Sequence, residues 1–158
     1  MNIIIPIIIG VAASFIAWII PAELFIPRIS AMRYSEEKEV VKNKTKETEE
    51  EIEYLTRKIL VKNKSFLYSA YNISYSFEFY NSDDTIVYSE SWTFPHLKRG
   101  EKRAMPLKAI KLDDLNSKKV VGFSLSIICE NRYGTKKKSG PYKMSEYRID
   151  KKSYQLDD

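Results

Sequence analysis

Cysteine, histidine, glycine and proline are scarce in this chain, and their scarcity excludes several classes of protein. The 158 residues include one cysteine, one histidine, five glycines and six prolines. A single cysteine cannot form an intrachain disulfide, which excludes the disulfide-rich secreted scaffolds. The few glycines and prolines exclude collagen-like and low-complexity chains. The length allows one ordinary domain together with an anchor or a tail.

Residue types that carry catalysis or bind metals are also few. His96, the sole histidine, follows a proline in a sequence typical of a surface turn, and Cys129 lies in an apolar run that predicts a buried, inert thiol. The paired carboxylates at 83–84 and 113–114 lack the pattern of a calcium loop, and no phosphate-binding glycine loop is present. We therefore predict no catalytic residue, no cofactor and no metal site, and a protein that is not an enzyme.

One long apolar run stands near the start of the chain. Residues 3–22 carry no charged side chain, and eleven of them are Ile, Val or Phe. A helix of this length rises about 30 Å, the thickness of the bilayer hydrocarbon, and these residues favour insertion by roughly 3 to 7 kcal/mol. A cleaved signal peptide is the alternative, but it normally begins with basic residues, which are missing here. We predict a single-pass transmembrane helix within an anchor covering residues 1–29.

Basic residues that follow the apolar run predict its orientation. Arg28, Arg33, Lys38 and Lys42 come after the run, whereas only the α-amino group precedes it. Basic flanks stay on the cytoplasmic side of a membrane. We therefore predict a cell-membrane protein whose C-terminal domain lies in the cytoplasm.

A segment crowded with Glu and Lys follows the predicted anchor and covers residues 30–57. Three interpretations remain open: a short stalk helix, a strand followed by a long hairpin loop, and a solvated spacer. The density of charge favours the spacer. We therefore treat residues 30–57 as a charged juxtamembrane segment.

Alternation of apolar and polar residues dominates the remainder of the chain. The clearest strand covers residues 71–79, in which aromatic residues and Ile alternate with Asn, Ser and Glu. Further strands are expected near residues 59–63, 86–92, 105–107, 121–129 and 135–144, with turns at 81–84, 95–100 and 131–134 and one helical turn or loop at 113–117. Short, regularly spaced strands are typical of an immunoglobulin-like β-sandwich. We predict a mainly β domain over residues 58–150 and a tail over residues 151–158.

Several short motifs resemble a known family. Pro27-Arg28-Ile29-Ser30 follows the membrane segment, Lys62-Asn63-Lys64-Ser65 ends a strand, and the stretches 126–137 and 142–149 follow later. Together they are similar to the cytosolic immunoglobulin-like domain, of the E-set type, of inwardly rectifying potassium channels and their small bacterial relatives. The resemblance implies the fold and a cytosolic location. Channel activity is not implied, because there is one membrane segment and no TVGYG-like filter.

Charge is unevenly distributed along the chain. Residues 1–57 carry 7 Lys and Arg against 9 Asp and Glu, a net charge of −2, whereas residues 58–158 carry 19 against 12, a net charge of +7. The candidates for contact with an anionic surface are Lys98, Arg99, Lys102, Arg103, Lys136, Lys137 and Lys138. Such clusters suit anionic lipid or an acidic protein. A nucleic acid is a poorer match, since exposed aromatic residues are not interleaved with the basic ones.

These observations favour a membrane-anchored binding or scaffolding module that recognises another protein or the inner leaflet. Self-association through the helix would make it a homo-oligomer. Two alternatives remain. One is an extracytoplasmic anchored immunoglobulin-like module, because the strand pattern is also similar to such modules in bacterial lipoproteins. The other is a membrane-disrupting effector that is triggered when its β-domain clusters.

Overall fold

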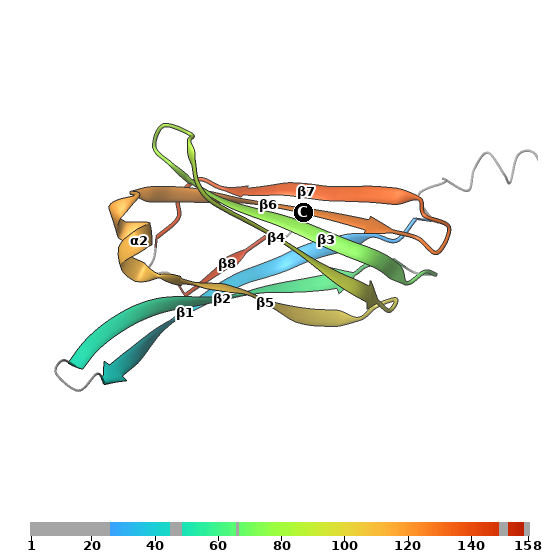
Figure 1. Ribbon diagram of the computed structural model, residues 1–158. Coiled ribbons are helices and arrows are strands. Elements are labelled where there is room, and N and C mark those ends of the chain that lie inside the picture. Colours follow the sequence, from blue (N-terminus) through green and yellow to red (C-terminus); the bar gives the residue numbers. More distant parts are fainter. Residues whose placement is uncertain (1–25, 45–48, 66, 149–151, 157–158) are drawn as a thin grey trace, which may run out of the picture.

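Two four-stranded antiparallel sheets form the protein, and they pack face to face as a β-sandwich (Figure 1). The computed structural model describes residues 26–44, 49–65, 67–148 and 152–156. Sheet A has the strand order β5-β2-β1-β8 and sheet B the order β4-β3-β6-β7. The elements are β1 (Ile29–Lys44), β2 (Glu49–Asn63), β3 (Ala70–Asn81), β4 (Ile86–Leu97), β5 (Lys102–Lys111), α2 (Leu112–Ser117), β6 (Val120–Glu130), β7 (Lys136–Met144) and β8 (Ser153–Gln155). The prediction of a mainly β sandwich is confirmed.

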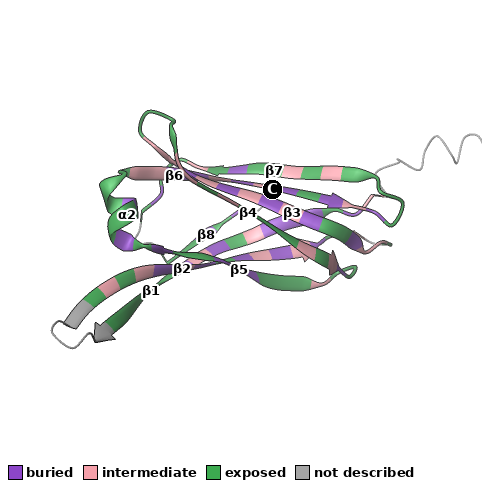
Figure 2. Cartoon of the chain, in the orientation of Figure 1, coloured by how far each residue is buried: buried purple, intermediate pink, exposed green. Residues whose placement is uncertain are grey.

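Apolar side chains on one face of each strand form the core between the two sheets. On β3, Tyr75, Phe77 and Phe79 are buried, while Ser76 and Glu78 between them are half-buried and lie on the opposite face of the strand. Figure 2 shows the same alternation of buried and exposed positions on the neighbouring strands. Because successive side chains of a strand point to opposite faces, one face fills the core and the other meets water. The strands predicted at 71–79 and 121–129 and the helical turn at 113–117 are therefore present.

The charged segment 30–57 is not a spacer; it forms most of a β-hairpin. β1 and β2 pair from Ile29–Asn63 to Lys44–Glu49, with one shift of register between Ala31 and Arg33, so the sandwich begins at residue 29 rather than at residue 58. Its inward positions include Ile29, Ala31 and Tyr34, all buried. The tail predicted at 151–158 is also wrong in part, because residues 153–155 form β8 beside β1. The spacer prediction was wrong because the charged side chains lie mainly on outward positions of the strands and on the part of the hairpin farthest from the sandwich.

That far part projects from the sandwich as a two-stranded ribbon. β5 pairs with β2 only from Tyr54 to Lys62, and β8 pairs with β1 only over residues 33–35. Among the described residues, β1 beyond Glu36 and β2 before Tyr54 pair as strands only with each other, and a 2.7 Å ion pair joins Lys42 to Glu51. Val40 and Val41 lie here and are 49% and 38% exposed. The ribbon therefore offers apolar side chains to the surroundings.

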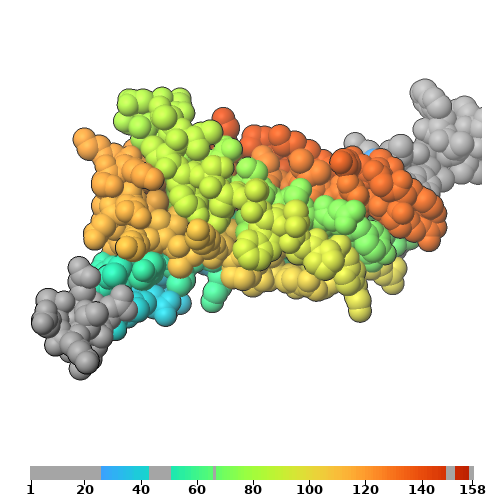
Figure 3. Space-filling model, viewed as in Figure 1, coloured from blue at the N-terminus to red at the C-terminus, as the bar shows by residue number. Residues whose placement is uncertain are grey.

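The two ends of the sandwich are built from different connections (Figures 1 and 3). The proximal end, as we call it, is where β1 begins, β2 ends and the chain turns from β4 to β5 and from β6 to β7. Its segments are residues 26–28, 64–65, 67–69, 98–101 and 131–135. The distal end carries α2, the β3–β4 turn and the projecting hairpin. The predicted turn at 95–100 is narrower than expected, because residues 95–97 belong to β4.

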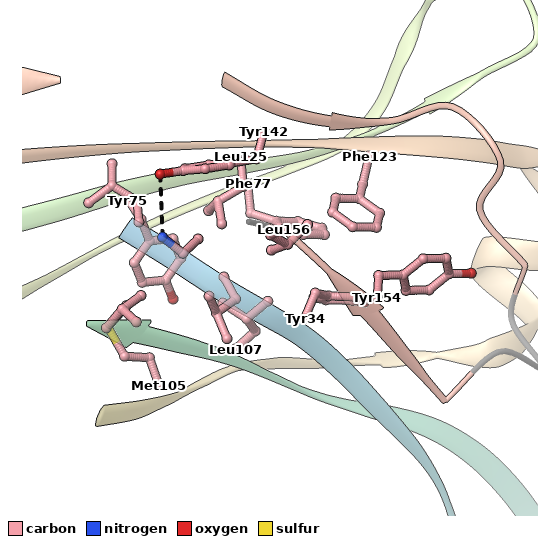
Figure 4. Packing of buried hydrophobic residues seen from close by; sticks show 14 of the residues in the cluster. Tyr34, Tyr75, Phe77, Met105, Leu107, Phe123, Leu125, Tyr142, Tyr154 and Leu156 are labelled. Carbon is pink, nitrogen blue, oxygen red and sulfur yellow. Dashed lines mark hydrogen bonds between the residues drawn. The ribbon is translucent and has the colours of Figure 1, made fainter. Parts of the chain in front are cut away.

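Aromatic rings fill the centre of the core (Figure 4). The ring centroid of Tyr34 lies 5.4 Å from that of Phe77, 4.7 Å from that of Phe123 and 6.1 Å from that of Tyr154. These residues come from β1, β3, β6 and β8, so both sheets contribute. Aromatic pairs at such distances add about 0.5 to 1.5 kcal/mol each beyond the area they bury. The stack therefore holds one sheet against the other.

A buried cation lies beside this stack. Arg57 on β2 has a side chain with 0% exposure, and its guanidinium carbon lies 5.2 to 5.4 Å from the ring centroids of Phe77, Phe79 and Tyr88. Its Nη2 donates to Glu90 Oε1 at 3.0 Å and to the Lys108 carbonyl at 2.6 Å. Nε and Nη1 have no hydrogen-bond partner among the described residues. The three rings and one carboxylate are therefore what stabilises this charge in the core.

Glu36 is the second ionisable group in the core. It is 6% exposed, and its Oε2 accepts hydrogen bonds from Tyr34 at 3.0 Å and Tyr147 at 2.8 Å. Burial raises the pKa of Glu36 to about 7, against the opposing effect of both hydroxyl donors. The folded protein therefore holds a proton on Glu36 more tightly than the unfolded chain does.

The predicted membrane anchor falls almost entirely outside the described residues. Of residues 1–29 the structure describes only 26–29, where the chain enters β1. Within the described ranges no helix is long and apolar enough to cross a membrane.

We expect Glu90→Gln to lower the free energy of unfolding by about 3 kcal/mol, because it leaves the buried Arg57 cation without its carboxylate. The double variant Arg57→Met/Glu90→Gln should recover most of that loss, since an apolar side chain needs no counter-charge. Urea unfolding of the full chain in nonionic detergent, followed by circular dichroism, measures both. Glu53→Gln, on the exposed ribbon, is the matched control. A Glu90→Gln variant as stable as this control would contradict the role of the ion pair.

We expect the stability of the protein to fall as pH rises from about 5 to about 8, with Glu36 as one cause. Its folded pKa is about 7 and its ordinary value 4.5, so its contribution is complete below the lower value and lost as pH passes the higher one. Glu36→Gln cannot ionise and should gain stability over the wild type as pH increases. Urea midpoints at several pH values test this. A gain that does not change with pH, or an equal gain in the exposed control Glu37→Gln, would refute it.

Candidate functional site

All seven basic residues predicted from the sequence lie at or near the proximal end, in two groups. Lys98 and Arg99 occupy the β4–β5 turn, and Lys102 and Arg103 begin β5. The second group, residues 136–138, begins β7 and pairs with the end of β6. β5 and β7 are edge strands of different sheets, so the two groups lie on opposite margins of the same end.

Three further cations that sequence reasoning did not select lie at this end. Arg28 precedes β1, and Lys62 and Lys64 occupy the end of β2 and the residue just after it. Backbone bonds fix their placement: the Lys64 amide donates to the Arg28 carbonyl at 2.7 Å, and Lys62 lies directly opposite Lys102 in the β2–β5 register. The sequence gives no signal for this grouping, because 40 positions separate Lys62 from Lys102 and only strand pairing brings them together.

Asn63 holds the proximal connections in place. It is fully buried, and its Nδ2 donates to the carbonyls of Tyr68 at 2.9 Å and Leu97 at 3.2 Å. Its Oδ1 accepts from the Ser65 amide at 3.0 Å, and its carbonyl accepts from the Gly100 amide at 3.0 Å. One side chain thus fixes the β2–β3 connection relative to the β4–β5 turn. Buried amides satisfied in this way order the backbone around them.

Acidic residues neutralise part of the proximal charge. Glu101 pairs with Arg103 at 2.6 Å, and a hydrogen bond from the Lys98 amide, together with Arg103, lowers the pKa of Glu101. Glu130 lies 3.5 Å from the Lys136 ammonium, and a hydrogen bond from Asn72 lowers the pKa of Glu130. Both carboxylates therefore stay ionised at neutral pH and screen one cation each.

Several cations of the proximal end have no such acidic partner among the described residues. Arg28, Lys62, Lys98 and Lys102, all at or beside the β1, β2 and β5 ends, make no ion pair with another described residue, and neither do Arg132, Lys137 and Lys138 on the other margin. Like charges directly opposite each other on neighbouring strands destabilise the pair, and Lys62 and Lys102 are such a pair. Excess positive charge concentrated at one end attracts anions.

A depression opens within this basic end. It has a volume of about 450 Å³ and is lined by Lys62, Asn63, Lys64, Ser65, Arg99 and Gly100. The Asn63 hydrogen bonds described above position both of its walls, one from β2 and one from the β4–β5 turn. Three of the six lining residues are cations, and no acidic residue is among them.

The remaining candidates for chemistry lie elsewhere. Cys129 is 1% exposed, burial raises the pKa of its thiol to about 11, and it donates to the Pro27 carbonyl at 3.5 Å. It is the buried, inert thiol that the sequence predicts. His96 lies in β4 instead of a turn, with its ring stacked 6.1 Å from that of Tyr71. Within the described part of the chain, no three His, Cys, Asp or Glu side chains come together as metal ligands would.

Comparison with known proteins adds no relative. The chain matches no model of a protein family and no curated protein sequence. What the proximal end can do must therefore be argued from its own chemistry. It presents ammonium and guanidinium groups on a rigid frame, and these groups bind anions through charge and through hydrogen-bond donation.

Proposed function

We propose that this protein is a single-pass membrane-anchored binding or scaffolding module whose basic proximal end faces the anionic inner leaflet of the cell membrane. The observation that carries the proposal is where the chain enters the sandwich. Residues 26–28, which follow the apolar run, lie beside the loops that hold the basic clusters. Ala22 and Arg28 are six steps apart in the chain, so they lie at most about 21 Å apart even when the segment is fully extended. An anchor at residues 3–22 would therefore keep the proximal end close to the bilayer.

Electrostatics supports contact with anionic lipid from that position. Each basic residue near an anionic leaflet contributes about 1 kcal/mol, and the effect fades over a Debye length of about 8 Å at physiological salt. Cations without an ion pair, among them Arg28, Lys62, Lys98 and Lys102, lie at the end that the anchor would hold against the surface. A sandwich tethered by its opposite end would gain little from the same residues.

The distal end supports the second half of the proposal, the binding of another protein. The hairpin projects away from the basic end and exposes Val40 and Val41. An isolated two-stranded ribbon is marginally stable in water. A partner that covers these valines would stabilise it. Self-association through the anchor would gather several such ribbons, which suits a scaffold.

We further propose that the sandwich is of the immunoglobulin type, related to the cytosolic domain of inwardly rectifying potassium channels. Strand order supports this. β2 and β5 neighbour each other in sheet A, as strands B and E do in an immunoglobulin domain, and β3, β6 and β7 follow each other in sheet B as C, F and G do. β4 takes the place of strand C′ beside C. The proposed role is binding without catalysis, and the proposed location of the domain is the cytoplasm.

We expect the proximal end, and not the distal end, to contact anionic bilayers. The full chain is reconstituted into vesicles with an environment-sensitive fluorophore on Thr135→Cys at the proximal end or on Ser82→Cys at the distal end; Cys129 is buried and stays unlabelled. In vesicles containing phosphatidylglycerol the proximal probe should shift to the blue and resist acrylamide quenching, and high salt should reverse both effects. Vesicles of phosphatidylcholine alone are the control. Equal quenching at both positions in the anionic vesicles would contradict the proposal.

We expect the domain to be protected from protease added to intact spheroplasts of a bacterial host expressing the full chain, and to be digested once the membrane is permeabilised. The reason is the basic flank of the apolar run, which predicts a cytoplasmic domain. Reporter proteins of known location in the same spheroplasts control for lysis. Digestion from the outside would instead favour the extracytoplasmic alternative.

A further inference from the structure

The depression at the proximal end has the composition of an anion site. Lys62, Lys64 and Arg99 line it together with the polar residues Asn63 and Ser65 and with Gly100. These groups come from two separate segments, and three successive residues of one of them, 63–65, are fixed by hydrogen bonds. Three cationic residues from two segments therefore line one concave surface, which distinguishes it from scattered surface lysines.

The backbone around the depression is held in a defined shape. Gly100 has φ of +68°, a left-handed conformation that favours glycine, and open space lies where a Cβ would be. Its amide is bonded to the Asn63 carbonyl, so the turn that carries Arg99 is tied to β2. A site whose frame is ordered before binding loses less conformational entropy when its ligand arrives.

Repulsion between two lysines beside the depression favours the binding of an anion. Lys62 on β2 lies directly opposite Lys102 on β5, and neither has an ion-pair partner among the described residues. An anion in the depression beside Lys62 would offset this repulsion. Of the common biological anions, a phosphate monoester carries a charge of about −1.5 to −2 and three acceptor oxygens, which matches three cations better than a singly charged group does.

We propose that this depression binds a phosphate group, to which Arg99 would donate through its planar guanidinium while Lys62 and Lys64 act as point charges. The inference rests on the proposed membrane function for its main source of ligand, a phosphate monoester on a lipid headgroup. Free phosphate in solution offers the same chemistry. The experiment therefore contains an arm for each source.

The test uses the full chain in nonionic detergent and follows the backbone amide signals of Ser65 and Gly100 by NMR. The probes are short-chain phosphatidic acid, a monoester; short-chain phosphatidylglycerol, a singly charged diester; and inorganic phosphate. We expect phosphatidic acid or inorganic phosphate to shift both signals, and phosphatidylglycerol to bind about tenfold more weakly. The double variant Lys62→Gln/Arg99→Gln should weaken monoester binding about tenfold or more, because two charge-assisted contacts are lost.

A control variant with the same net charge distinguishes binding in the depression from nonspecific electrostatic attraction of the anion to the protein. Lys111→Gln/Lys119→Gln removes the same two charges from exposed positions at the distal end and should leave the affinity unchanged. Binding by phosphatidic acid alone assigns the site to lipid, and equal binding by inorganic phosphate assigns it to a soluble ligand. The absence of binding by either, or an equal loss of affinity in both double variants, would overturn the proposal.

The NMR test of phosphate binding can succeed or fail separately from the fluorophore test of membrane contact. Detergent solution offers no bilayer surface, so the depression can bind phosphate even if the fluorophore on Thr135→Cys stays exposed on anionic vesicles. Conversely, a protected fluorophore together with unshifted Ser65 and Gly100 signals would leave the membrane contact standing and remove only the phosphate site.

Discussion

The buried cation of Arg57 is the constraint on which the arrangement of the two sheets depends. The residue belongs to sheet A, but its carboxylate partner Glu90 and the rings of Phe77, Phe79 and Tyr88 all belong to sheet B. A guanidinium out of water is tolerated only where its partners are correctly placed. A slip of one residue in β2 would send Arg57 to the outer face and Thr56 into the core. This charge therefore helps to specify the register of β2 and the stacking of one sheet on the other.

The same register produces the candidate site. With β2 fixed by Arg57, its last residues reach the proximal end, where Asn63 is buried and its two lysine neighbours are not. Asn63 then ties the β2–β3 connection to the β4–β5 turn, and the basic residues of both segments surround one depression. The core and the site are thus consecutive stretches of one strand. The end of β2 therefore supports the loop residues that complete the proposed anion site.

Several elements were predictable from residue patterns alone, and others were not. The strands at 71–79 and 121–129 were predictable because one face of each is apolar along its whole length. β1 was not, because past Tyr34 most of its side chains are charged, and two of its buried positions are held by Ser30 and Glu36. The sequence cannot distinguish the buried Glu36 from a solvent-exposed glutamate. The two tyrosines that donate hydrogen bonds to it are 2 and 111 positions away in the chain.

The sequence by itself determined the fold class and the chemistry that is present: alternating strands, a surplus of basic residues after residue 57, and one thiol inside an apolar strand. These follow from local periodicity and composition, which neighbours in the chain settle. Only the tertiary structure decided that the charged segment joins the sandwich and that Lys62, Lys64 and Arg99 line one depression with Lys102 beside it. The reason is physical. Strand pairing and a buried amide join segments far apart in the chain, and no local pattern encodes which strands will meet.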